Sequence, residues 1–156
     1  MVDKVSFKLT GLESLKKKFE AVTNDVKYKG GRAALRKAAR FVVNDIKKRA
    51  ETFDDPATVR SIKDNADLRW DSRYAKRTGD LAFKIGILGG ASSRTKLVDG
   101  KKAPTPYWRH LELGNEKTPA HPFVRPALSE NIGTVTDTFV REYEKALDKA
   151  IAKAGK

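Results

Sequence analysis

Cysteine is absent from the 156-residue chain, so disulfides, thiolate nucleophiles, iron–sulfur clusters and thiolate zinc sites are excluded. Only two histidines are present, which leaves little imidazole for metal binding or for acid–base chemistry. The longest run of bulky apolar residues is Phe41–Val43, far short of the ~20 residues that a membrane-spanning helix needs. No apolar leader follows Met1, so we expect a protein that is made in a cytoplasm and that enters no membrane.

Acidic residues are too few to balance the basic ones, since 20 Asp and Glu accompany 33 Lys and Arg and the net charge is +13. This excess favours acidic partners such as nucleic acid, an anionic membrane or an acidic protein ring. It is concentrated in residues 27–49, where nine basic residues accompany one acidic residue. We predict that this segment contributes to a basic surface through Arg36, Arg40 and Lys47.

Hydrophobic periodicity predicts an α+β fold, in which a small and mainly antiparallel sheet is flanked by two or three helices. Alternating patterns predict strands at Val5–Leu9 and Leu81–Leu88. A capping box at Thr10 and Glu13 predicts a helix that Lys29-Gly30-Gly31 interrupts with a hinge or tight turn. A second helix is expected from about Arg32 to Glu51, and a long amphipathic helix with an apolar stripe from Ile132 to Ile151 is expected at the C-terminus.

Three stretches lack a clear period, within what we expect to be one domain spanning residues 1–156. Residues 53–80 are expected to be mostly loop. Residues 91–106 hold hardly any large apolar side chain and are expected to form a mobile loop, whose basic residues extend the basic surface: Arg94, Lys96, Lys101 and Lys102. Residues 104–126, here called the clamp, contain five of the six prolines and are expected to be rigid and extended.

The sequence carries no recognisable catalytic motif and no metal-binding motif. His110 and Glu112 are two residues apart and would share one side of a strand, so a site completed by His121 is conceivable, but a structural role of these residues is favoured. The glycine-rich stretch at 86–96 lacks the Gly-Lys-Ser/Thr ending of a phosphate-binding loop, and no serine lies in a nucleophile elbow. We therefore predict no enzyme, no metal and no cofactor.

The clamp carries two motifs that resemble a known family: residues 107–114 (YWRHLELG) and residues 118–128 (TPAHPFVRPAL). They are similar to the tail-completion, or head-to-tail joining, proteins of long-tailed phages. That family shows an aromatic pair, then Glu-Phe-Gly-Thr, then Pro-Ala-Arg-Pro-Phe and Arg-Pro-Ala-Leu before a C-terminal helix. Leu113, Asn115 and His121 depart from this pattern without changing its spacing. Upstream, residues 9–15, 78–81 and 84–90 fit the family as well, so the resemblance extends over nearly the whole chain.

The resemblance implies a structural protein at the neck of the virion, which completes the tail and joins it to the head. It implies a homo-oligomeric ring, expected to be hexameric, that is assembled in the host cytoplasm and through which DNA passes. The implied partners are the connector or stopper, the tail terminator and the tail tube. Within the clamp, the resemblance implies interface or structural roles for Tyr107, Trp108, Glu112, Gly114, Pro122, Phe123, Arg125 and Pro126.

Two points within the clamp stay open at the level of sequence. Trp108 and Phe123 either anchor contacts between subunits or pack inside one subunit. Glu112 is expected to pair with Arg125 or Arg109 and so hold the clamp to the start of the last helix, with an ordinary exposed glutamate as the alternative.

The alternatives at the level of function are a tail terminator ring, a small basic nucleic-acid-binding protein and a histidine-dependent nuclease. Nonspecific contact with DNA in the channel is compatible with the neck role, because a basic surface binds phosphate without regard to sequence.

Overall fold

The computed structural model describes residue 20 and residues 23–54, 60–88 and 103–154. The predicted strand Val5–Leu9, the capping box and most of the first predicted helix lie outside these residues. In chain order the elements are the π-helix η1 (Asp25–Gly30), α2 (Gly31–Ala50), the 3₁₀-helix η2 (Glu51–Phe53), α3 (Ile62–Asn65), β1 (Ala66–Trp70), α4 (Ser72–Thr78), β2 (Phe83–Ile87), α5 (Trp108–Leu113) and α6 (Val124–Ala154). The α+β fold with one antiparallel sheet and a long C-terminal helix is confirmed.

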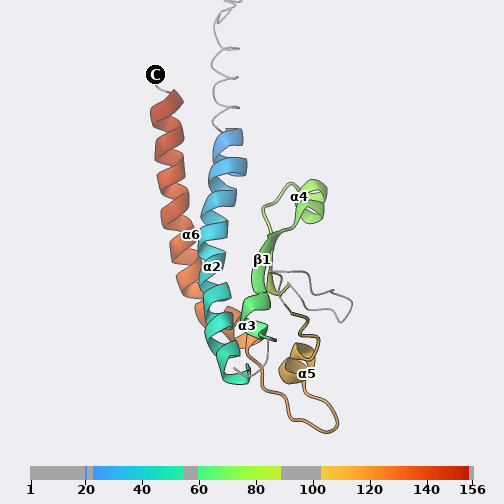
Figure 1. Ribbon diagram of the computed structural model, residues 1–156. Helices are drawn as coiled ribbons and strands as arrows, with labels where there is room; N and C mark the ends of the chain where they lie inside the picture. The colour runs from blue at the N-terminus through green and yellow to red at the C-terminus, as the bar shows by residue number, and fades with distance from the viewer. Residues whose placement is uncertain (1–19, 21–22, 55–59, 89–102, 155–156) are drawn as a thin grey trace, which may run out of the picture.

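Helix α2 lies at the centre of the structure, with α6 antiparallel to it on one side and the sheet on the other (Figure 1). The predicted helix from about Arg32 to Glu51 is confirmed, and its apolar residues Ala39, Val42, Val43, Ile46 and Ala50 are buried. Small alanines allow the backbone of a neighbouring element to approach closely, and the branched side chains fill the space between the layers.

The expected break at Lys29-Gly30-Gly31 is wrong, because η1 continues directly into α2. Gly31 is buried, and a Cβ atom placed on it would lie 2.7 Å from Leu81 Cδ1 and 3.3 Å from Tyr143 Cε2. The glycine therefore provides room for neighbouring side chains instead of ending the helix.

The expectation that residues 53–80 are mostly loop is also wrong, because they contain α3, β1 and α4. Strand β1 pairs with β2 in antiparallel register, with Leu68 opposite Ile85 and Trp70 opposite Phe83. Arg32 of α2 lies over the Trp70 ring, with its Cζ atom 4.4 Å from the ring centroid. The face of the sheet that carries these aromatic rings is thus turned toward α2.

Polar contacts fix α6 beside α2. Asp45 of α2 accepts a hydrogen bond from Asn131 Nδ2 at 2.8 Å, and Arg49 donates to Glu130. Nearer the N-terminal end of α2, Lys37 Nζ lies 2.8 Å from a Glu142 carboxylate oxygen. These ion pairs are exposed on at least one side and individually weak, so apolar packing supplies most of the attraction between the helices.

The hydrophobic core lies where the C-terminal half of α2 meets α3, the sheet and the start of α6. Its buried members are Val42, Ile46, Ala50, Ile62, Ala66, Ile87, Phe123 and Ala127. Because Phe123 and Ala127 enter this core from residues close to the start of α6, the position of the clamp and that of the last helix are set together.

Asn65 holds together both ends of the segment that the structure leaves undescribed at 89–102. Its backbone oxygen accepts from the Leu88 N–H at 2.9 Å, and its side-chain Nδ2 donates to the oxygen of Ala103 at 2.9 Å and to Thr105 Oγ1 at 2.8 Å. Ala103 and Thr105 are buried. Residues 103–106 of the predicted mobile loop are therefore held in place, and the rest of that loop, with its four basic residues, lies outside the described residues.

Candidate functional site around the buried Glu112

The clamp contains a short helix and is not extended throughout. Residues Trp108–Leu113 form α5, so the expectation of an extended conformation is wrong for this part of the clamp. Two residues apart on a helix, His110 and Glu112 point in different directions, and His110 is exposed whereas Glu112 is 4% exposed. Within the described ranges, no group of three His, Cys, Asp or Glu residues could hold a metal ion.

Glu112 is the one charged residue that is buried in the described part of the chain, and its carboxylate caps the start of α6. Oε2 accepts from the backbone N–H of Phe123 at 2.7 Å and of Val124 at 2.9 Å. Oε1 accepts from the backbone N–H of Arg125 at 3.1 Å and from its Nε at 3.0 Å. The first N–H groups of a helix have no partner within it and carry its positive partial charge, so a carboxylate is well suited to this place.

The Glu112–Arg125 pair that the sequence suggested is present, and Arg109 is not its partner. Arg125 also donates from Nη2 to the backbone oxygen of Glu112 at 2.9 Å, so the guanidinium spans the carboxylate and the end of α5. The guanidinium remains largely solvated, because the Arg125 side chain is 64% exposed. The pair thus joins a buried anion to a cation that retains much of its hydration.

The environment lowers the pKa of the Glu112 carboxyl below its ordinary value. Burial acts in the opposite direction and would raise this pKa, because it disfavours the charged form. The N–H groups of Val124, Phe123 and Arg125, with the Arg125 side chain, stabilise the carboxylate and outweigh the burial. Glu112 is therefore held as an anion, in the protonation state that can accept all of these hydrogen bonds.

A tight return connects α5 to this cap. Gly114 has φ 73° and ψ 173°, a backbone conformation that is nearly confined to glycine, and a Cβ atom there would lie 2.9 Å from Ala120 N. Asn115 Oδ1 accepts from the N–H groups of Lys117 and Thr118 and closes the turn. The chain then returns to α5, where the His121 N–H donates to the Leu111 oxygen at 2.7 Å.

The aromatic residues of the clamp pack against the core of the chain, and Phe123 is the most deeply buried of them. Phe123 is 1% exposed, and its ring centroid lies 5.6 Å from that of Phe53. Tyr107 and Trp108 are half-buried against the same core, and burial raises the pKa of the Tyr107 hydroxyl. The sequence left open whether Phe123 contacts another copy of the chain or packs within its own chain, and in the structure it packs within its own chain.

The two prolines of the motif lie on either side of the cap. Pro122 is exposed and precedes Phe123, and Pro126 is half-buried in the first turn of α6. A proline in the first turn costs no hydrogen bond, because the N–H that it lacks would have had no helical partner. The Arg-Pro-Ala-Leu motif thus lies within α6 and does not precede it.

The described part of the predicted basic surface lies along α2. Arg36 and Arg40 are exposed and Lys47 is half-buried. Arg36 is directed toward the sheet, with its Cζ atom 5.6 Å from the centroid of the Phe83 ring.

A second group of basic residues on and near α4 was missed by the sequence analysis. Asp71, Arg73, Tyr74, Arg77 and Lys84 line a pocket of about 260 Å³. Asp71 caps α4 by accepting from the Tyr74 N–H at 3.1 Å and also pairs with Lys84 at 3.0 Å. These contacts lower the pKa of Asp71, with the Lys84 hydrogen bond as the main cause. An N-cap aspartate followed by a glycine at the C-terminal end, Gly79, is the sequence signal that could have located this helix.

A buried carboxylate whose partners are all helix N–H groups and one arginine orders the chain and leaves no acceptor free for a substrate. The fold and this site therefore define an α+β protein in which a buried carboxylate joins α5 to α6. No helix among the described residues is long and apolar enough to cross a membrane.

A comparison with protein families identifies the group. The chain belongs to the family described as "Bacteriophage HK97-gp10, putative tail-component", whose model matches residues 13–114. The protein is thus a bacteriophage tail component that belongs to the virion, and other phage tail proteins are its partners. No curated protein and no solved structure matches the chain.

The matched residues include α2, the sheet, α5 and Glu112, and they end at Gly114. The second motif of the clamp and α6 therefore lie beyond the family match. Glu112 joins the two parts, because its carboxylate lies within the matched residues and its hydrogen-bond donors lie outside them.

Proposed function

We propose that this tail component acts at the neck of the virion, where it completes the tail and joins it to the head as a subunit of a homo-oligomeric ring around the DNA channel. The role is structural and non-catalytic. The neighbouring proteins would be the connector or stopper on one side and the tail terminator or tail tube on the other.

One observation carries this proposal: the residues on which the resemblance to head-to-tail joining proteins rests act together as one structural unit. Glu112 accepts from the N-terminal N–H groups of α6, and Gly114 has the positive φ that the return toward Phe123 requires. Phe123 fills the core, and Arg125 completes the cap. These four motif residues thus each have a defined structural role, as expected for a motif that forms the same connection between two helices in related proteins.

The test is a phage in which this gene carries an early stop codon, compared with the same phage complemented by the full chain. We expect filled heads and separate tails of normal length, seen by electron microscopy of the lysate, and joined particles on complementation. The protein should be present in purified wild-type virions and located at the head–tail junction by gold-labelled antibody.

The other outcomes identify the alternatives. Tails of abnormal, extended length would indicate a tail terminator ring, because the tube would continue to polymerise. Normal virions that lack the protein would contradict a structural role and favour the small nucleic-acid-binding protein. Loss of nuclease activity on changing His110 or His121 would favour the nuclease.

A further inference from the structure

Helix α6 presents apolar side chains that no described element covers. Leu128, Ile132, Val140, Leu147 and Ile151 are between 39% and 57% exposed. In Figure 1, α6 forms the outer edge of the structure, with α2 beside it on one side only. Exposed apolar side chains that gather along one helix indicate a protein contact, whereas single ones are ordinary.

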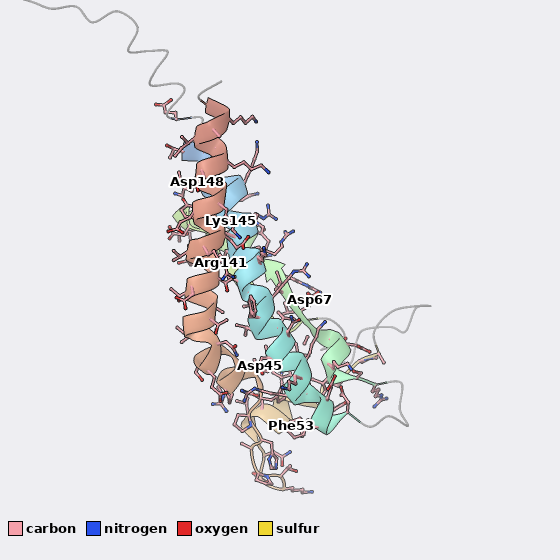
Figure 2. The ribbon with its side chains drawn as sticks, turned by 90° about the vertical axis from the view of Figure 1, so that its left-hand side faces the viewer. Asp45, Phe53, Asp67, Arg141, Lys145 and Asp148 are labelled. Carbon is pink, nitrogen blue, oxygen red and sulfur yellow. The ribbon has the colours of Figure 1, made fainter. Side chains whose placement is uncertain are left out.

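An acidic row runs beside the C-terminal part of these apolar residues. At 100° per residue, Asp137, Glu144 and Asp148 project next to Val140 and Leu147. All three acidic residues are exposed, and none of their carboxylates has an ion pair or a side-chain hydrogen bond among the described residues. Figure 2 shows Asp148 near the C-terminal end of α6, beyond Arg141 and Lys145. We call Asp137, Val140, Glu144, Leu147 and Asp148 the α6 strip.

The exposed side of α2 has the opposite character. Arg40 and Lys48 are exposed and have no partner among the described residues, and Phe41 between them is 42% exposed. Asn44 lies on the same side of the helix. We call Arg40, Phe41, Asn44 and Lys48 the α2 strip, which offers two cations and one large apolar ring.

We propose that the α6 strip of one copy packs against the α2 strip of a second copy of this chain. The axial distances match, because Asp137 and Glu144 are about 10 Å apart and Arg40 and Lys48 about 12 Å apart at a rise of 1.5 Å per residue. Phe41 then covers Val140, the apolar residue of the α6 strip that lies between these two acidic residues. The contact combines desolvated apolar surface with opposite charges, the arrangement that gives protein interfaces both affinity and orientation.

Charge also decides which strips meet. Two α6 strips facing each other would bring acidic rows together, and two α2 strips would bring cations together, so the contact joins unlike strips. The ring of the proposed function requires the head-to-tail, heterologous form of this contact, in which one copy of a pair keeps its α2 strip free and the other keeps its α6 strip free, so that repetition closes a ring or extends a filament. The inference rests on the proposed function for the choice of a closed ring and supplies the surfaces that form it.

Nucleic acid is a poor occupant of the α6 strip, since phosphates and the acidic row repel each other. Phosphates could instead bind the α2 strip alone. The experiment therefore measures both self-association and DNA binding of the same variants.

The test uses charge-reversed full-length chains and sedimentation velocity over a range of concentrations. We expect D137K/E144K and R40E/K48E each to associate at least about tenfold more weakly than the wild type, because like charges then meet. A one-to-one mixture of the two variants should recover association, and so should one chain that carries all four substitutions. The control D67K/D80K makes the same change in net charge as D137K/E144K at exposed positions outside both strips, and should behave as the wild type.

Cysteine cross-linking tests the same contact in assembled virions. This chain has no native cysteine, so a maleimide can react with its thiols only at the introduced positions. A phage that carries F41C/V140C should give a ladder of multimers with a short flexible bismaleimide, whereas F41C alone and V140C alone should not give dimers. Failure of the variant mixture to recover association, or dimers from a single cysteine, would overturn the heterologous contact. Loss of DNA binding without loss of association in R40E/K48E would assign the α2 strip to nucleic acid. Neither result depends on the stop-codon phenotype, which tests the neck role separately.

Discussion

Replacement of Glu112 by glutamine is the most direct test of the cap on α6. Glutamine keeps one oxygen acceptor but places an NH₂ group where Oε2 accepts from the N–H groups of Phe123 and Val124. Two backbone donors are then unsatisfied and face another donor. The negative charge that the helix N-terminus and Arg125 stabilise is lost as well.

The magnitude follows from what this carboxylate binds. Removal of one partner from a buried ion pair costs about 3–5 kcal/mol, and the low end applies because Arg125 is largely exposed and can be hydrated again. The loss of hydrogen bonds to a charged group, at about 1.5–3 kcal/mol each and not additive, agrees with this range. We expect E112Q to lower the free energy of unfolding by about 3 kcal/mol.

Urea denaturation followed by circular dichroism measures this difference. For a chain of this size, about 3 kcal/mol corresponds to a fall in Tm of roughly 6–12 °C. The matched control is E116Q, because Glu116 is exposed in the turn that follows and has no partner in the described ranges. We expect the control to stay within about 0.5 kcal/mol of the wild type. Equal stability of E112Q and E116Q would refute the argument that the carboxylate anchors α6.

The pH dependence gives an independent check on the same group. The pKa of Glu112 is lowered in the folded state, so its contribution is fully present above the ordinary value of about 4.3 and is lost as the pH falls through the folded pKa. The stability difference between the wild type and E112Q should therefore be constant between about pH 5 and pH 8 and should shrink below about pH 4. A difference that persists unchanged in acid would mean that the ionised carboxylate is not its source.

Three other substitutions test the packing. Gly114→Ala should cost about 2–3 kcal/mol in urea denaturation, because the positive φ and the 2.9 Å approach to Ala120 N both oppose a Cβ atom; a neutral result would contradict this backbone geometry. Gly31→Ala should change stability by less than about 1 kcal/mol, because better helix propensity offsets a small movement of the Leu81 side chain, whereas Gly31→Leu should destabilise clearly. Asn65→Ala should cost about 2–3 kcal/mol and should speed hydrogen exchange at Trp108, whose N–H donates to the Thr105 oxygen, because the Asn65 amide no longer holds the chain at residues 103–105. Unchanged exchange there would show that other contacts fix these ends.

Several parts of the fold were determined by the sequence alone. The 3.6-residue period of α2 and α6 and the alternation around Phe83–Ile87 were sufficient to predict two helices and a strand. Each of these elements buries one side against a neighbour, so its apolar residues recur with the period of its secondary structure. The charges near Glu112 were sufficient to suggest Arg125 or Arg109 as its partner, since the clamp offers few arginines, and the structure selected Arg125.

Tertiary packing decided what these local patterns could not. Gly30-Gly31 has the composition of a turn, yet Leu81 and Tyr143 occupy the space beside Gly31 and the helix continues. Trp108–Leu113 is helical although prolines flank it, because its apolar residues have a core to pack against. The backbone donors of Glu112 come from residues 123–125. Those contacts exist only once α5 and α6 are brought together, and no spacing in the sequence encodes a distance between two elements.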